Sequence, residues 1–135
     1  MDDAMCKAIL VILLAVVSSS AAAAWFKIDK DGRLTVYADP TTRRRAGDFV
    51  KVWIMNDYKT FQVIPGTEKS YLSAKVQRKY DCKEVRMESL DMVYYSGNMG
   101  GGQTVNSISF PEPNWTPVVP GTIERFLWKL NCLKR

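Results

Sequence analysis

The sequence predicts an α+β protein in which antiparallel strands are followed by one C-terminal helix packed on the sheet. Residues 71–82 alternate between apolar and polar side chains, which is typical of a strand with one buried face. Residues 120–132 carry apolar side chains at helical spacing instead. Cys82 ends the first segment and Cys132 ends the second, so a disulfide can join the two elements.

The first 24 residues have the pattern of a secretory signal peptide. An apolar run over residues 8–17 precedes three serines and four alanines, which offer small-residue cleavage frames within Ala21 to Ala24. The run is shorter than the ~20 apolar residues that span a bilayer. We therefore expect a signal peptide at 1–24, an exported domain at 25–135, and no transmembrane span after cleavage. No cysteine for lipid attachment stands at the cleavage site, and Cys6 would leave with the signal.

Cysteine usage agrees with export. After cleavage, Cys82 and Cys132 are the two remaining thiols, and in an oxidising compartment they should pair. The bridge would close a loop of about 51 residues, for which the chain-entropy treatment gives roughly 4 kcal/mol.

The N-terminal half of the domain is expected to form three strands. Residues 25–28 and 34–38 flank an Asp-Gly turn, which is a strong hairpin signal. Residues 39–48 contain Pro40 and Gly47 and are expected to form a loop. The segment 49–58 is apolar on both sides past its middle, which favours a central position in the sheet.

The second half continues with two strands, a connection and the helix. In residues 84–95 the apolar phase changes near Glu88, which predicts a bulge that bends the strand and curves the sheet. A glycine-rich hairpin loop at 96–102 leads to a last strand at 104–110. Residues 111–120 are a stiff proline-rich connection. The helix follows with Thr122 as its N-cap.

The helix carries apolar side chains on two sides. Ile123, Phe126, Leu127 and Leu130 form one stripe. Trp128 and Cys132 share a different side. We expect the side nearer Cys132 to be held to the sheet, and the pattern leaves open whether the connection covers the other side or leaves it partly exposed.

The composition argues against catalysis. The chain contains no histidine, so Ser-His and Cys-His pairs and the commonest transition-metal ligand are missing. With both cysteines in a bridge, no thiolate zinc site is expected either. No spacing singles out a carboxylate pair. We therefore expect a non-enzymatic protein without a cofactor or metal site.

Binding is the function class that the charge favours. Removing Asp2, Asp3 and Lys7 with the signal from 19 basic and 14 acidic residues leaves a net charge of +6. This surface suits anionic lipid, polysaccharide or acidic protein, whereas an exported domain without a recognition motif does not suit nucleic acid.

Two groups of residues are candidates for ligand binding. Lys75, Gln77 and Lys79 share the polar face of the strand at 71–82, and Arg43, Arg44 and Arg45 stand together in the expected loop. Both groups also have a structural interpretation, because basic residues on a solvent-facing strand are ordinary and protect against edge pairing, and three arginines can simply be solvated.

Several short motifs, in their order, resemble one family. They are Trp25, Tyr37-Ala38-Asp39-Pro40, Val52-Trp53, Asp57-Tyr58-Lys59, Tyr80-Asp81-Cys82, Tyr95-Ser96-Gly97, Trp115, Pro120-Gly121-Thr122, Trp128 and Cys132. Together they resemble the surface-adhesin protein E-like domain of Gram-negative bacteria, over essentially the whole of residues 25–135. The resemblance implies a curved antiparallel sheet of about six strands with a C-terminal helix laid across it and tethered by a disulfide.

For function, the resemblance implies a protein of the cell surface or outer membrane that binds host extracellular-matrix and plasma proteins. The alternative is a periplasmic structural or envelope-associated protein with no host ligand, because a fold alone does not fix a function.

Overall fold

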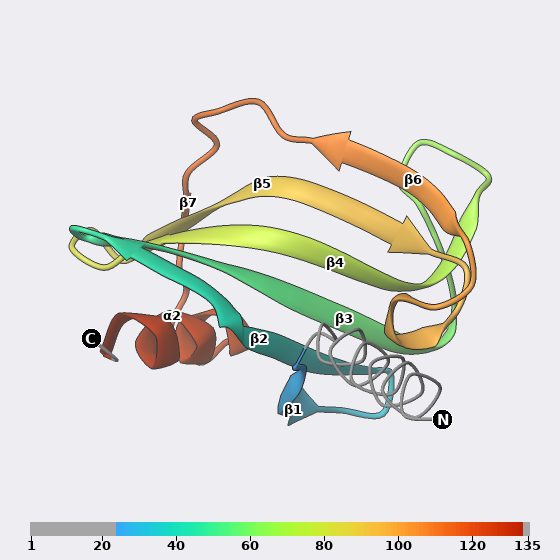
Figure 1. Cartoon of the computed structure of the whole chain (residues 1–135), viewed down its shortest axis with the longest axis horizontal. Coiled ribbons are helices and arrows are strands. Elements are labelled where there is room, and N and C mark those ends of the chain that lie inside the picture. The colour runs from blue at the N-terminus through green and yellow to red at the C-terminus, as the bar shows by residue number, and fades with distance from the viewer. Residues whose placement is uncertain (1–23, 134–135) are drawn as a thin grey trace, which may run out of the picture.

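The computed structural model describes residues 24–133, which form one antiparallel sheet and a C-terminal helix (Figure 1). The predicted signal peptide falls outside this range apart from Ala24 and stays a prediction. The sheet strands are β1 (Phe26–Lys30), β2 (Leu34–Ala46), β3 (Phe49–Val63), β4 (Ser70–Asp81), β5 (Arg86–Tyr95) and β6 (Thr104–Ser109). They lie side by side in chain order, and each is antiparallel to the next. The expected α+β class with a six-stranded sheet is confirmed.

Three shorter or later elements complete the chain. A 3₁₀ turn, η2 (Asn98–Gly100), lies in the glycine-rich loop between β5 and β6. A two-residue strand, β7 (Thr116–Pro117), pairs with the start of β5. The helix α2 (Ile123–Leu133) then lies below one end of the sheet in Figure 1. No helix within residues 24–133 is long and apolar enough to cross a membrane.

The prediction of a loop at residues 39–48 is wrong, because β2 continues as far as Ala46. The register between β2 and β3 shifts between Asp39 and Arg44, where one side-chain bond holds the irregular segment locally and another crosses to β3. The Asp39 carboxylate accepts from the backbone N–H of Thr41 at 3.0 Å, and the Thr42 hydroxyl accepts from the backbone N–H of Trp53 at 3.1 Å. A proline is tolerated at such an irregularity, where no ladder donor is needed.

The predicted bulge in the fifth strand is present, slightly further along. Opposite β4, the register shifts between Ser89 and Met92, so that Gln77 faces two residues of β5 instead of one. An extra residue of this kind bends its strand and increases the local twist. The long strands β3, β4 and β5 curve together in Figure 1.

One face of the curved sheet, which we call the covered face, carries the core. Near α2, the buried side chains include Val52, Ile54, Val76 and Tyr80, which pack with Leu127 of the helix. A second buried cluster consists of Ile64, Tyr71, Ala74 and Tyr94. Ala74 and Val76 are two residues apart on β4, so both clusters lie on the same face.

The helix turns one defined side to the sheet. The side chain of Leu127 is 1% exposed, whereas that of Phe126 is 51% exposed. The Thr122 hydroxyl accepts from the backbone N–H of Arg125 at 3.2 Å, which confirms the predicted N-cap. The sheet therefore covers the side that carries Leu127, and part of the predicted apolar stripe faces solvent.

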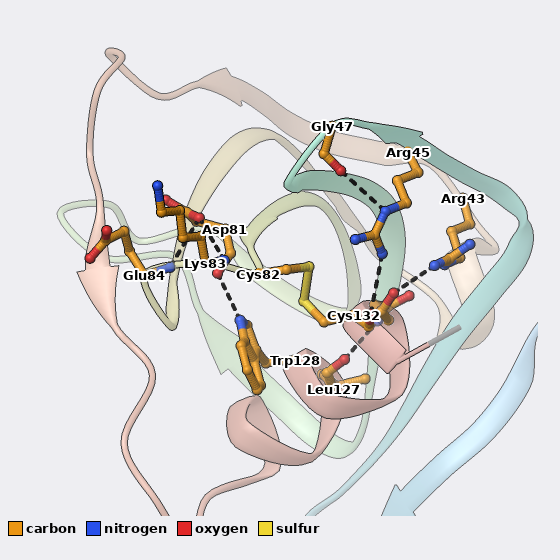
Figure 2. Close-up of a disulfide and its surroundings, with 11 residues drawn as sticks. Arg43, Arg45, Gly47, Asp81, Cys82, Lys83, Glu84, Leu127, Trp128 and Cys132 are labelled. Atoms are coloured by element: carbon orange, nitrogen blue, oxygen red, sulfur yellow. Dashed lines mark hydrogen bonds between the residues drawn. A yellow bond between two sulfur atoms is a disulfide. The ribbon is translucent and has the colours of Figure 1, made fainter. Parts of the chain in front are cut away.

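The predicted disulfide between Cys82 and Cys132 is confirmed and ties the last turn of α2 to the end of β4 (Figure 2). Its sulfur atoms are 2.13 Å apart. Beside it, the Trp128 indole N–H donates to the backbone carbonyl of Asp81 at 2.8 Å. Further along β4, Arg78 interrupts the apolar alternation because it pairs with Glu124 of the helix at 3.6 Å.

Candidate binding face

The face of the sheet opposite α2, which we call the open face, gathers one of the two predicted groups. Lys75, Gln77 and Lys79 alternate with the buried residues of β4, so they line this face in one column. Their cross-strand partners on β3 are Met55, Trp53 and Lys51, respectively. Lys51 and Trp53 thus join the predicted column, and Lys51 is not among the residues predicted to bind a ligand. Their alternation with Val50, Val52 and Ile54 was the signal that places them there.

Aromatic rings lie beneath the basic side chains of the open face. The Lys75 ammonium is 5.0 Å from the ring centroid of Trp53, and the Lys79 ammonium is 4.8 Å from that of Phe49. Trp115 stacks on Phe49 with 5.8 Å between centroids, and the Arg86 guanidinium lies 4.4 Å from the Trp115 ring. Such cation–π contacts hold a long basic side chain in place and leave its charge intact.

The connection from β6 to α2 delivers Trp115 to this face. It is more than the stiff connection that the sequence predicts, because β7 pairs with β5 and the side chain of Val118 is buried. The Asn114 carboxamide also accepts from the backbone N–H of Ser89 and donates to the Ser89 carbonyl. These contacts fix the connection across the end of the sheet.

The arginines divide between the two faces, because they lie on a strand and not in a loop. The Arg43 guanidinium donates to the Asn131 carbonyl at 2.6 Å, and that of Arg45 donates to the Cys132 carbonyl at 3.2 Å (Figure 2). Both guanidinium groups therefore bind backbone carbonyls at the C-terminal end of α2, where a positive charge is favourable. They do not form a single basic patch with Arg44.

Arg44 points the other way and extends the open face. It is exposed and is the cross-strand partner of Lys51, which in turn is the partner of Lys79. We call these three residues the basic row. They place like charges on three adjacent strands, an arrangement that destabilises a sheet unless a counter-charge is present.

Within residues 24–133 no carboxylate forms a short ion pair with the basic row, although Glu88 of β5 is the cross-strand partner of Lys79. The two ion pairs within residues 24–133 are Arg78 with Glu124 and Arg86 with Asp81. In that part of the chain, no carboxylate oxygen lies within 4.0 Å of the charged nitrogen atoms of Arg44, Lys51 and Lys79. The row therefore keeps its charge and can attract an anion.

The two buried acids at the margin of this face differ in their pKa. Burial raises the pKa of Glu88, Lys79 opposes the change, and the nearby Glu112 carboxyl raises it further. Burial also raises the pKa of Asp81, but hydrogen bonds from Arg86 and from the backbone N–H groups of Glu84 and Lys83 outweigh it and hold that pKa below its usual value. Asp81 is thus kept charged, whereas the charge of Glu88 is disfavoured.

The arrangement offers binding chemistry. The described residues contain no group of three or more acidic or cysteine side chains placed to hold a metal ion. The open face combines positive charge, half-buried rings and the Gln77 carboxamide, a combination that can hold an anionic partner by charge and stacking.

Comparison with known proteins gives one family and one fold. The family model described as surface-adhesin protein E matches residues 25–133. No curated protein sequence matches the chain significantly.

Solved structures of Haemophilus influenzae protein E are similar to this chain. The selenomethionine form has a TM-score of 0.61 at 12% identity, with 85% of this chain and 90% of that chain covered. Crystal form II has a TM-score of 0.61 at 12% identity, with coverage of 84% and 91%. Protein E from the non-typeable bacterium has a TM-score of 0.54 at 12% identity, with coverage of 83% and 86%. At this level of identity the likeness shows a shared fold.

Proposed function

Because the chain belongs to the surface-adhesin protein E family, we propose that it is an exported, non-enzymatic binding protein whose open face holds an acidic partner at the bacterial surface. Host extracellular-matrix and plasma proteins are the partner class that we propose. The observation that carries the proposal is the basic row, which keeps three like charges on the face that the helix does not cover.

Charge would act first in this binding. A row of cations raises the local concentration of an anionic partner and speeds its association. Because the row is exposed, dissolved salt should screen the attraction, with a Debye length of about 8 Å at physiological ionic strength. The rings of Trp53, Phe49 and Trp115 would then contribute short-range contacts that salt does not screen.

A salt series tests this mechanism. The exported protein is passed over an immobilised panel of extracellular-matrix and plasma proteins at increasing sodium chloride concentration. We expect binding that weakens with salt and that is lost in a Lys51→Glu, Lys79→Glu double variant. A Lys59→Glu, Lys69→Glu double variant changes the charge equally at two exposed positions outside the row and should bind normally. Binding that is insensitive to salt, or equal loss in both double variants, would contradict the mechanism.

Export and location are separate parts of the proposal. The sequence pattern supports removal of residues 1–24, and the mass of the protein recovered from fractionated cells tests it. Protease added to intact cells should then degrade the protein if it stands at the surface. Protection until the outer membrane is opened would favour the alternative of a periplasmic, envelope-associated protein.

A further inference from the structure

A polar pocket opens on the open face beside the basic row. The bulge of β5 creates it, because Leu90 and Asp91 both stand opposite Gln77. The pocket has a volume of about 280 Å³, and its walls come from β3, β4, β5, the end of β6 and the connection that follows. Segments far apart in the sequence therefore meet around it.

The walls of the pocket combine two kinds of surface. Leu90 and Phe110 supply an apolar part. The polar part includes Gln77, whose carboxamide makes no hydrogen bond within the described range 24–133. It also includes the Asp91 carboxylate, which accepts from the Ser109 hydroxyl at 2.7 Å.

Charges of both signs border the pocket. The Lys51 ammonium lies on one side and the Glu112 carboxylate on the other. Lys51 also belongs to the basic row, so the pocket and the row are continuous. A ligand in the pocket can therefore reach the positive charge of the basic row without leaving the site.

This set of groups matches the surface of a sugar ring. Hydroxyl groups both donate and accept hydrogen bonds, so they can use carboxylates, a carboxamide and an ammonium together. The C–H face of the ring suits an apolar wall. The volume of about 280 Å³ lies just below the roughly 300–1,000 Å³ of pockets for drug-sized ligands, which suits a ligand as small as one saccharide unit.

We propose that this pocket is a saccharide subsite and that the open face binds its matrix or plasma protein partners through an acidic glycan that they carry. One sugar unit would occupy the pocket, and its carboxylate or sulfate, or that of the next unit, would lie on Lys51 and Lys79. The inference rests on the proposed function and names the ligand class of the same face. An extended acidic peptide could use the basic row, but it would leave the polar walls of the pocket without the hydroxyl groups that they suit.

Two ligands with the same kind of charge separate these possibilities. A chondroitin sulfate hexasaccharide offers acidic groups on sugar rings, whereas poly-glutamate offers them on a peptide. Binding of each to the exported protein is measured by titration calorimetry. We expect the hexasaccharide to bind, and the charge-neutral changes Gln77→Leu and Ser109→Ala, both in the pocket wall, each to weaken it about tenfold. The same two variants should leave poly-glutamate binding unchanged, and Lys79→Glu should weaken both ligands.

Matched controls keep the outcome clear. Gln103→Leu makes the same chemical change at an exposed position outside the pocket, and a neutral chitin hexasaccharide tests whether the acid is needed. Unchanged hexasaccharide affinity in both pocket variants would overturn the saccharide subsite. Absence of hexasaccharide binding, with salt-sensitive binding to matrix proteins retained, would overturn the subsite and leave the proposed function standing. If the protein bound neither the chondroitin sulfate hexasaccharide, nor poly-glutamate, nor the matrix proteins, the proposed function would be overturned as well.

Discussion

The covered face and the open face of the sheet are built from the same strands, yet the charged side chains on them have different kinds of partner. On the covered face, Arg78 of β4 has Glu124 of the helix as its partner. On the open face, Lys79 is the next residue along the same strand. It lies between Lys51 of β3, which carries the same charge, and Glu88 of β5, whose charge is disfavoured. Residues on the covered face are thus placed for stability, whereas the basic row is maintained at some cost to stability.

The arginines of β2 repeat this contrast within three residues. Arg43 and Arg45 cap the carbonyl end of α2, and Arg44 between them turns to the open face. Because side chains alternate along a strand, neighbouring residues of one type take different roles. Substitutions on the covered face should therefore change stability more than substitutions in the basic row.

Loss of the disulfide should have the largest effect on stability. Replacing Cys82 or Cys132 with Ser reopens a loop whose ends are 50 residues apart, and the loss should approach 4 kcal/mol. Chemical unfolding under oxidising conditions measures it. The Cys82→Ser, Cys132→Ser double variant controls for a newly freed thiol, and a wild-type midpoint in that variant would mean that the tether does not stabilise the fold.

Truncating the side chain that α2 buries against the sheet should also lower stability strongly. Leu127→Ala removes a side chain that is 1% exposed, and such changes cost about 2–5 kcal/mol. The neighbouring Phe126→Ala removes a side chain that is half exposed and should cost much less. The difference between the two unfolding midpoints measures how much more the buried side of α2 contributes to stability than its exposed side. Equal losses would contradict the packing of α2 described above.

Two buried acids give the third test, because they should respond to pH in opposite directions. The pKa of Glu88 is raised in the folded state, so its contribution to stability is full below the unfolded value of about 4.3 and is lost as pH rises through the folded pKa. Glu88→Gln should therefore raise the unfolding midpoint at pH 7. The advantage should disappear in acid.

Asp81 is the matched comparison for that test. Its pKa is lowered in the folded state, so its contribution is present above the unfolded value of about 3.9 and is lost as pH falls through the folded pKa. Asp81→Asn should therefore lower the midpoint at pH 7 and approach the wild type in acid. Thermal unfolding from pH 3 to 8 measures both variants, and parallel curves for the two would contradict the assignment.

The sequence predicts the covered face better than the open face, for a physical reason. Burial imposes the alternation of β4, which is visible locally. The pairing of Cys82 with Cys132 follows from the cysteine count, since two thiols allow one bridge. The path of residues 39–48 was missed because Pro40 and Gly47 usually break a strand. A bond between the Thr42 hydroxyl and the backbone N–H of Trp53 replaces a ladder contact there, and such a replacement depends on the partner strand.

The candidate site shows the same limit. Alternation alone brings Lys75, Gln77 and Lys79 together, since one strand carries all three. The position of Trp115 and the contact between the Glu88 and Glu112 carboxyl groups depend on how the connection after β6 crosses the sheet. No local pattern encodes that crossing, so the pocket beside Gln77 could not be foreseen.

The smallest effect on stability should come from the basic row itself. Lys51→Gln removes a charge that lies between Arg44 and Lys79, so repulsion falls and stability at low salt should rise by about 0.2–1 kcal/mol. Added salt should erase the gain. Lys69→Gln, at an exposed position outside the row, should show no comparable gain. Urea unfolding at two salt concentrations measures both variants. Lower stability in Lys51→Gln would show that the basic row supports the fold. Its charge would then have a structural role and would not be kept for a partner.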